Sequence, residues 1–314
     1  MGTTTKEYKG RGLRDGILKT SLDSGKLKKM LKVIIEDKNK DLDVQIRNNY
    51  LNIYYKGGNI AKVNSEQSIE FDMFYFYQDE DKPKKEILKD ASIMAKLKKQ
   101  RNDLITKFKK HNYDVFFEEA KEVMEKWLKI HPKPERMEQH QMSLDNKYGK
   151  SNYTIIDLEY QVSTKSPFAC EFTPKGKTKP KKPRFDIIAV DGNGQLCVIE
   201  LKKGEGALKG TSGLKEHWYC YDLSVGINHK PFVEEMKMIL QQKQEYDLID
   251  DKVKITKAIP KFMFAYAFDK KTSIISQESA FINEYNELYK EIEKNIDVIK
   301  INPGTFKLLN LWKL

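Results

Sequence analysis

The chain has 314 residues, enough for one large domain or two modest ones with sizeable hydrophobic cores. Its 57 lysines and arginines exceed its 46 acidic residues, and the net charge of +11 favours an anionic partner, nucleic acid before a membrane surface. Three cysteines without CxxC spacing argue against a disulfide framework or a zinc site, and the lack of a signal-peptide core or a run of roughly 20 apolar residues favours a soluble cytoplasmic protein.

The first 112 residues are expected to form a β-meander with accompanying helices, a module for recognition, dimerisation or regulation. Helical spacing of apolar residues predicts a short helix over 26–36. The period then changes to two, and the Asn48-Asn49 and Gly57-Gly58 pairs supply the positive φ angles of tight hairpin turns. Core packing or a protein interface accounts for the many aromatic side chains here more readily than nucleobase stacking does. The predicted strands cover 44–47, 50–55, 59–63 and 68–77.

Residues 113–314 are expected to form a mixed α/β domain whose central sheet is flanked by helices. Two helices, predicted over 86–110 and 114–130, lead up to a helix that begins at Pro134. The elements that follow alternate between strands and helices, and the strongly apolar segment 261–268 is expected at the centre of the sheet. In chain order they are strands over 154–162, 184–191 and 195–203, helices over 212–222 and 231–247, the strand 261–268, and an amphipathic helix over 278–297.

The strands at 184–191 and 195–203 carry charged residues where strands normally carry hydrophobic ones. The linker between them, Asp191-Gly-Asn-Gly194, predicts a hairpin turn, and a turn centred on Asn193 sets Asp186 directly opposite Glu200. Side chains alternate along a strand, so Lys202 points to the same face as Glu200. Opposed Cβ atoms lie roughly 5 Å apart, and two carboxylates at that distance repel each other unless a cation lies between them. The hairpin therefore predicts a metal site.

The order of these elements, with Asp186, thirteen intervening residues and then Glu200-Leu-Lys202, resembles the core of the PD-(D/E)XK nuclease superfamily. The Pro-Asp dipeptide of that family is Phe185-Asp186 here, and the resemblance covers about residues 133–270. It implies a restriction-endonuclease-like core and metal-dependent hydrolysis of phosphodiester bonds, in DNA rather than RNA. Restriction, phage defence or repair is the implied setting, and a homodimer is left open because many members need two active sites to cut both strands.

The resemblance also implies roles for individual residues. Asp186, Glu200 and the backbone carbonyl of Leu201 would bind Mg²⁺, with Mn²⁺ as a substitute, because hard cations prefer oxygen ligands. Lys202 would place its charge against the phosphate and the attacking water. Glu135, on the helix before the first strand, would orient that water or hold a second ion, and it is preferred over Glu138 for this role.

Two further features agree with a nucleic-acid substrate. His217 and Tyr221 occupy the positions of the Gln-x-x-x-Tyr motif of RecB-like members, with histidine in place of glutamine. The segment before the Asp186 strand holds six basic residues in ten and no acid, and its proline and glycine residues exclude a helix. An extended loop that contacts phosphates is expected there, with a solvated loop as the alternative. Its basic residues are Lys175, Lys177, Lys179, Lys181, Lys182 and Arg184.

Other interpretations stay open. The hairpin could be a surface element whose charges are solvated, although the aliphatic residues on the same face argue against this. The chain could also be a non-catalytic nucleic-acid-binding or scaffold protein that retains the nuclease fold. Asp157 and Glu159 share a face of the strand 154–162, and either one could join the metal site or face solvent.

Overall fold

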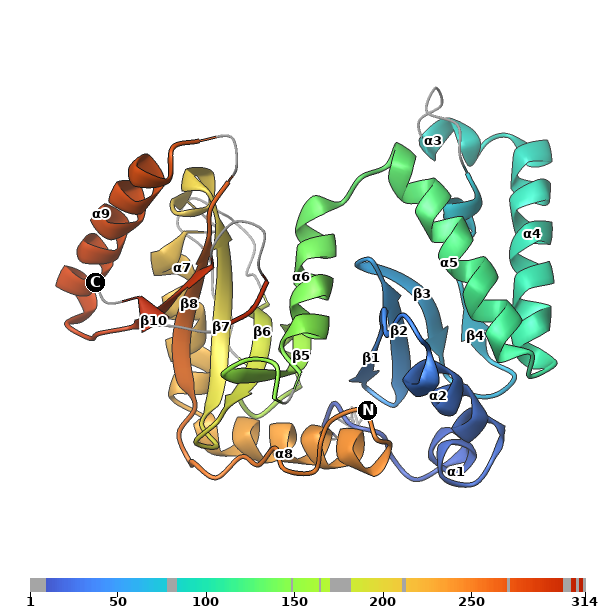
Figure 1. The fold of residues 1–314 in the computed structure, drawn as a ribbon, viewed down its shortest axis with the longest axis horizontal. Coiled ribbons are helices and arrows are strands. Elements are labelled where there is room, and N and C mark those ends of the chain that lie inside the picture. The colour runs from blue at the N-terminus through green and yellow to red at the C-terminus, as the bar shows by residue number, and fades with distance from the viewer. Residues whose placement is uncertain are drawn as a thin grey trace, which may run out of the picture. The chain divides into compact units, whose positions relative to one another are not determined.

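The computed structural model describes residues 10–77, 84–147, 149–163, 165–169, 182–210, 213–269, 272–301, 306–308 and 311–312, without the side chains at 84, 85, 134 and 135. The chain is mixed α/β, as predicted, and divides into two compact units (Figure 1). The first unit comprises residues 11–144 with 245–248, and the second comprises residues 145–244 with 249–314. The boundary expected after residue 112 falls inside the first unit, between two of its helices.

The sheet of the first unit is the predicted antiparallel meander, in the order β1-β2-β3-β4. Its fourth strand is shorter than expected. Asp72 accepts a hydrogen bond from the Phe74 amide and begins a 3₁₀ turn over Met73–Phe76, so the aromatic residues that follow leave the sheet. The strands are β1 (Leu42–Arg47), β2 (Tyr50–Tyr55), β3 (Gly58–Val63) and β4 (Ile69–Glu70).

Helices cover one face of this meander and complete its core. Phe108, Phe116 and Met124 come from two helices and are fully buried in the same cluster as Ile53 of β2. This shared core explains why the first unit extends well beyond residue 112. The helices are α1 (Ile17–Asp23), α2 (Lys26–Glu36), α3 (Lys84–Ile87), α4 (Ala91–Lys109), α5 (Tyr113–Ile130) and α6 (Pro134–Asp145), the last of which ends at the boundary between the units.

The sheet of the second unit has six strands in the order β10-β9-β8-β7-β6-β5. Neighbours β5, β6 and β7 are antiparallel, whereas β7, β8 and β9 are parallel, and β8 lies inside the sheet as predicted. The strands are β5 (Tyr153–Gln161), β6 (Arg184–Asp191), β7 (Leu196–Lys203), β8 (Lys261–Ala267), β9 (Asp297–Ile301) and β10 (Leu311–Trp312).

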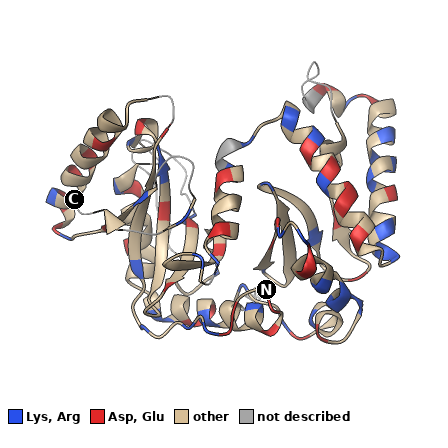
Figure 2. Cartoon of the chain, in the orientation of Figure 1, with Lys and Arg blue, Asp and Glu red and all other residues tan. Residues whose placement is uncertain are grey.

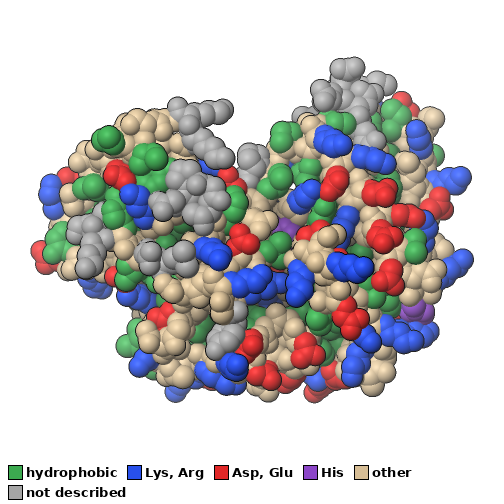
Figure 3. Space-filling view, in the orientation of Figure 1, with side chains coloured by type: hydrophobic (Ala, Val, Ile, Leu, Met, Phe, Trp, Pro, Cys, Tyr) green, Lys and Arg blue, Asp and Glu red, His purple; other side chains and the backbone are tan. Residues whose placement is uncertain are grey.

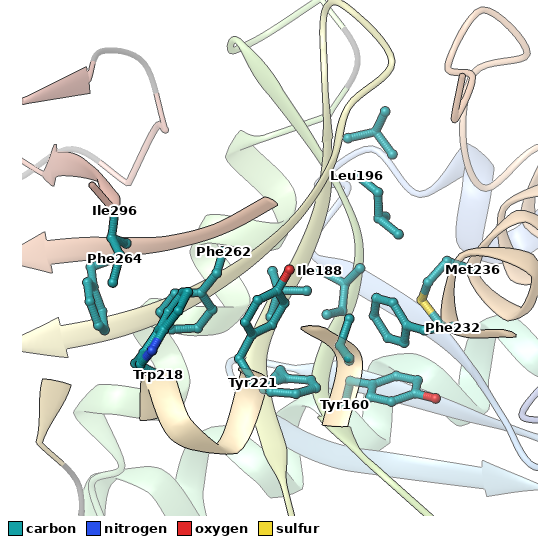
Figure 4. Close-up of a cluster of buried hydrophobic side chains, with 14 of the residues drawn as sticks. Tyr160, Ile188, Leu196, Trp218, Tyr221, Phe232, Met236, Phe262, Phe264 and Ile296 are labelled. Carbon is teal, nitrogen blue, oxygen red and sulfur yellow. The ribbon is translucent and has the colours of Figure 1, made fainter. Parts of the chain in front are cut away.

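Helices α7 (Leu214–Tyr221), α8 (His229–Glu245) and α9 (Ile274–Ile292) contribute to the core of the second unit. Figure 4 shows side chains from the sheet, such as Ile188 and Phe262, packed with Trp218 of α7 and Phe232 of α8. Helix α9 begins and ends several residues before its predicted bounds. Glu293 adopts a left-handed φ of 51° that ends the helix, and β9 (Asp297–Ile301) follows, so that only Asp297 of this strand had been predicted to be helical.

None of the helices in the described ranges is long and apolar enough to cross a membrane. Cys197 and Cys220 are buried free thiols, and Cys170 lies outside the described residues.

Candidate active site

The β6–β7 hairpin has the predicted turn and the predicted register. Asp191 Oδ1 accepts hydrogen bonds from the amides of Asn193 and Gln195, and Gly194 supplies a φ of +77°. The paired residues run from Val190 with Leu196 to Ile187 with Ile199. The next residues in this register are Asp186 and Glu200, which places the two carboxylates across from each other.

The backbone ladder between β6 and β7 stops one step before this pair. At that point the Leu201 amide donates a hydrogen bond to Asp186 Oδ2, over 3.0 Å. On its other edge β7 continues in register with β8, where Glu200 pairs with Phe264 and Lys202 with Tyr266. The Asp186 carboxylate therefore takes the place of a backbone acceptor for β7, while β8 holds the strand that carries Glu200 and Lys202.

Burial dominates the electrostatics of the site. Glu200 has no exposed surface, Lys202 is 3% exposed and Asp186 is partly buried. The pKa of Asp186 is raised to about 7, chiefly by burial and also by the negative charge of Glu200, against the opposing charges of Lys202 and His217. Burial likewise raises the pKa of Glu200 to about 7, opposed chiefly by Lys202. The carboxylates thus lie in an environment that disfavours two negative charges.

His217, on α7, reaches this carboxylate pair. Its Nδ1 lies 2.6 Å from Glu200 Oε2, so the two groups form an ion pair when the imidazole is protonated. Hydrogen bonding from the side chain and backbone of Asp186 also lowers the pKa of Glu200, but the buried Glu200 Oε1 makes no hydrogen bond of good geometry with any described residue. A buried carboxylate oxygen without a donor, beside a second carboxylate, fits the requirements of a hard divalent cation.

The side-chain ligands alone do not complete a metal site. Within the described part of the chain, no group of three His, Cys, Asp or Glu side chains is arranged to hold a metal ion. A Mg²⁺ ion here would need the carboxylates of Asp186 and Glu200 together with the Leu201 carbonyl, the ligand set that the family resemblance implies, and water molecules as further ligands.

Tyr221 is not brought to the carboxylates. Its hydroxyl donates a hydrogen bond of 2.9 Å to the carbonyl of Pro260, directly before β8 begins, and its ring packs 4.9 Å from that of Phe262 (Figure 4). The start of β8 lies level with Cys197, whereas Glu200 lies level with Phe264. Tyr221 is therefore a core residue at the opposite end of β7 from Lys202.

Replacing Tyr221 with phenylalanine is expected to lower the free energy of unfolding by about 1 kcal/mol, because the buried Pro260 carbonyl loses its donor. The nucleic-acid cleavage that the family resemblance implies should stay at the wild-type level. Urea unfolding and a cleavage assay on the same preparation measure the two effects. A large loss of cleavage at unchanged stability would contradict the assignment of Tyr221 to the core and would indicate a role for it in the site.

The basic segment is described only at its C-terminal end. Lys182 and Arg184 are exposed, whereas Lys175, Lys177, Lys179 and Lys181 lie outside the described residues. The guanidinium of Arg184 lies 3.8 Å from Glu159 Oε1, and its charge is among those that oppose the raised pKa of Glu200. Arg184 thus belongs to the electrostatic surroundings of the carboxylate pair.

The remaining candidate carboxylates have different surroundings. Glu135 lies on α6, which belongs almost entirely to the first unit, and its side chain is outside the described residues, so its catalytic role stays a prediction. Asp157 is fully buried and its Oδ1 accepts a hydrogen bond from the Leu158 amide. Glu159 is about one-third exposed and has a left-handed φ of 46° within β5.

Sequence reasoning missed Gln277 of α9, which orders the backbone that follows β8. Its side chain is fully buried, accepts a hydrogen bond from the Asp269 amide and donates to the carbonyls of Asp269 and Thr272. This segment lies next to Gly204, whose amide donates to Ala267 directly after the strand that carries Lys202. A signal was present, because Gln277 shares the helical spacing of the buried Phe281 and Tyr285.

Comparison with known proteins adds no family assignment. No protein-family model, curated protein or solved structure matches the chain. The fold and the site therefore define its class: a mixed α/β protein with a buried carboxylate pair and a lysine where an antiparallel hairpin joins a parallel strand.

Proposed function

We propose that this protein is a Mg²⁺-dependent nuclease of the PD-(D/E)XK type that hydrolyses phosphodiester bonds, with DNA as its substrate. The observation that carries the proposal is the convergence of Asp186, Glu200 and Lys202 at one end of the β6–β7 hairpin. The element order supports it, because a helix, three strands, a further helical region and another strand follow one another in the order that the family resemblance implies.

A purely structural role accounts poorly for this group. Burying a charged group without full compensation is costly, and Glu200 is fully buried with an oxygen that lacks a donor. Lys202 and His217 supply positive charge, yet the pKa values of both carboxyls remain raised. A site that disfavours its own charges gains free energy when a divalent cation binds, which is the arrangement expected of a metal-dependent enzyme.

Each residue of the site has a role in this proposal. Asp186, Glu200 and the Leu201 carbonyl would hold Mg²⁺, which supplies charge neutralisation at the phosphate and a lower pKa for bound water. Lys202 holds a proton at Nζ and donates it in a hydrogen bond to the phosphate or to the attacking water. His217 orients Glu200 through its contact with Oε2, and Arg184 adds positive charge at the edge of the site.

The direct test incubates the full-length protein with supercoiled DNA, linear DNA and single-stranded RNA, each with Mg²⁺, with Mn²⁺ and with EDTA. Hydrolysis of DNA that requires the divalent cation is expected. Absence of metal-dependent hydrolysis of every substrate would overturn the proposal, and hydrolysis of RNA alone would overturn the DNA assignment.

One observation favours the non-catalytic alternative, a nucleic-acid-binding or scaffold protein. His217 lies 2.6 Å from Glu200 Oε2, where it competes with a cation for that oxygen. The alternative is supported if the protein binds DNA tightly, shows no hydrolysis with Mg²⁺ or Mn²⁺, and does not bind either metal ion in a calorimetric titration.

A further inference from the structure

Helix α4 carries an unusual excess of positive charge. Asp90 caps its N-terminus by accepting hydrogen bonds from the amides of Ser92 and Ile93. Between this cap and residue 110 the only acidic residue is Asp103, whereas seven residues are basic. Figure 2 shows the contrast with α5, on which blue and red segments alternate. The basic residues are Lys96, Lys98, Lys99, Arg101, Lys107, Lys109 and Lys110.

Most of these charges are exposed and have no acidic partner. Lys107 forms an ion pair with Glu119 of α5, but the other five lysines are exposed and form no ion pair with any described residue. In the space-filling view, lysine and arginine side chains project from the right-hand edge, where α4 lies (Figure 3). Lys121 of α5 shows the opposite arrangement, because it is largely buried between Asp37 and Asp41, 2.5 Å from each.

Helix stability alone does not explain this distribution. Positive charge near a helix C-terminus is favourable, which accounts for Lys107 and Lys109 in the last turn. Lys96, Lys98 and Lys99 lie in the middle of the helix, where the dipole offers no such gain. Like charges one turn apart, such as Lys96 with Lys99 and Lys98 with Arg101, repel each other on the helix surface. The charge therefore lowers stability unless a polyanion binds.

The apolar face of α4 identifies the kind of polyanion. A helix that binds a membrane surface inserts exposed apolar side chains between the lipids. In α4 the apolar residues Leu97, Leu104 and Phe108 are buried in the unit itself, so only the charged face is available. This face extends from Lys96 to Lys110, about 21 Å along the helix axis, which matches roughly six base pairs of duplex DNA.

We infer that the exposed face of α4 is a second phosphate-binding surface, which contacts the DNA backbone independently of sequence and apart from the carboxylate site. The inference deepens the proposed function, since it specifies how the same substrate is held. Lys96, Lys99 and Lys110 lie within an arc of about 60° around the helix, which also holds the exposed Asp103, and these three lysines form the centre of this surface. Because each phosphate contact releases counterions, the surface contributes a salt-dependent part of the affinity.

The test compares two triple variants of the full-length protein that change its net charge equally. The first, K96Q/K99Q/K110Q, removes the centre of the α4 surface. The control, K32Q/K237Q/K290Q, removes three exposed lysines that each pair with a glutamate on their own helix. Fluorescence anisotropy measures binding of a labelled random-sequence DNA duplex in EDTA, between about 50 and 200 mM KCl.

The plot of log K against log salt concentration falls with a negative slope. In the α4 variant the magnitude of this slope should be smaller by about 2 to 3, close to one for each phosphate that is no longer neutralised, while the control keeps the wild-type slope. Equal slopes in all three proteins would overturn the inference. So would unchanged DNA binding by an α4 variant that no longer binds vesicles containing phosphatidylserine, because the partner would then be a membrane. If the wild-type protein cleaves DNA but the α4 variant keeps the wild-type salt slope, only the inference about α4 is refuted. If the α4 variant has a smaller slope but the wild-type protein hydrolyses no substrate, only the nuclease proposal is refuted.

Discussion

Replacing Asp186 with alanine is expected to reduce the proposed Mg²⁺-dependent DNA cleavage by roughly 10²- to 10³-fold, the scale seen when one group that stabilises a transition state is removed. Two effects combine in this variant. The site loses one of its two carboxylates, and the Leu201 amide loses the acceptor that replaces the backbone ladder at this point. Cleavage rates and a calorimetric Mg²⁺ titration on the same preparation should show that activity and metal binding are lost together.

Replacing Lys202 with methionine is expected to separate the loss of cleavage activity from the loss of metal binding. Methionine keeps the length and the apolar stem of the side chain but removes its charge, so cleavage should also fall by roughly 10³-fold. Metal binding should be kept or strengthened, because a positive charge that competes with the cation is gone. Lys203→Met is the matched control, since Lys203 points to the other face of the strand. An equal loss in the control, or full activity in the Lys202 variant, would contradict the assigned role.

Replacing Glu200 with glutamine is expected to stabilise the metal-free protein, although it removes activity. The pKa of Glu200 is raised to about 7 in the folded state, whereas a glutamate in an unfolded chain ionises near 4.3. Above pH 7 the folded protein must therefore hold a buried charge that the unfolded chain exposes to water. Glutamine removes that penalty, so the free energy of unfolding at pH 8 should rise by on the order of 2 kcal/mol in EDTA.

The pH dependence provides the check. Between about pH 7 and pH 4 the folded wild type binds a proton that the unfolded chain releases, so the contribution of Glu200 to stability improves as the pH falls through 7. The advantage of the glutamine variant should accordingly shrink toward pH 5. Urea unfolding at pH 8 and pH 5 measures this, with the exposed Glu205→Gln as a control that stays within about 0.5 kcal/mol of wild type. A glutamine variant that is less stable than wild type at both pH values would contradict the raised pKa.

The parts of the fold that the sequence predicted best are those specified by local chemistry. The turn at Asp191–Gly194 and the hairpin register depend on a few adjacent residues, and both agree with the structure. The aromatic segment after Glu70 misled the prediction because its alternation is typical of a strand, while Asp72 stabilises a turn there. The end of α9 was misplaced for a similar reason, since nothing in its periodicity announces the left-handed residue Glu293.

The sequence predicted which side chains of the two strands lie at the candidate site, but it did not predict how the residues of α7 are arranged around them. Strand alternation places Lys202 beside Glu200, but the contact between His217 and Glu200 depends on how α7 packs on the sheet. The same packing directs Tyr221 into the core, one turn further along that helix. The motif spacing predicts that His217 and Tyr221 both belong to the site, whereas their tertiary contacts place only His217 beside Glu200.

The point where the β6–β7 ladder ends has a mechanical consequence. Beyond Ile187 and Ile199 the two strands pair only with their outer neighbours, β6 with β5 as far as Arg184 and β7 with β8 as far as Lys203. The two strands of the hairpin thus separate at this end, with Asp186 on β6 and Glu200 on β7. A change in the separation of β6 and β7 here would change the distance between the two carboxylates without any rotation of their side chains. The hydrogen bond from the Leu201 amide to Asp186 connects the two strands at this point.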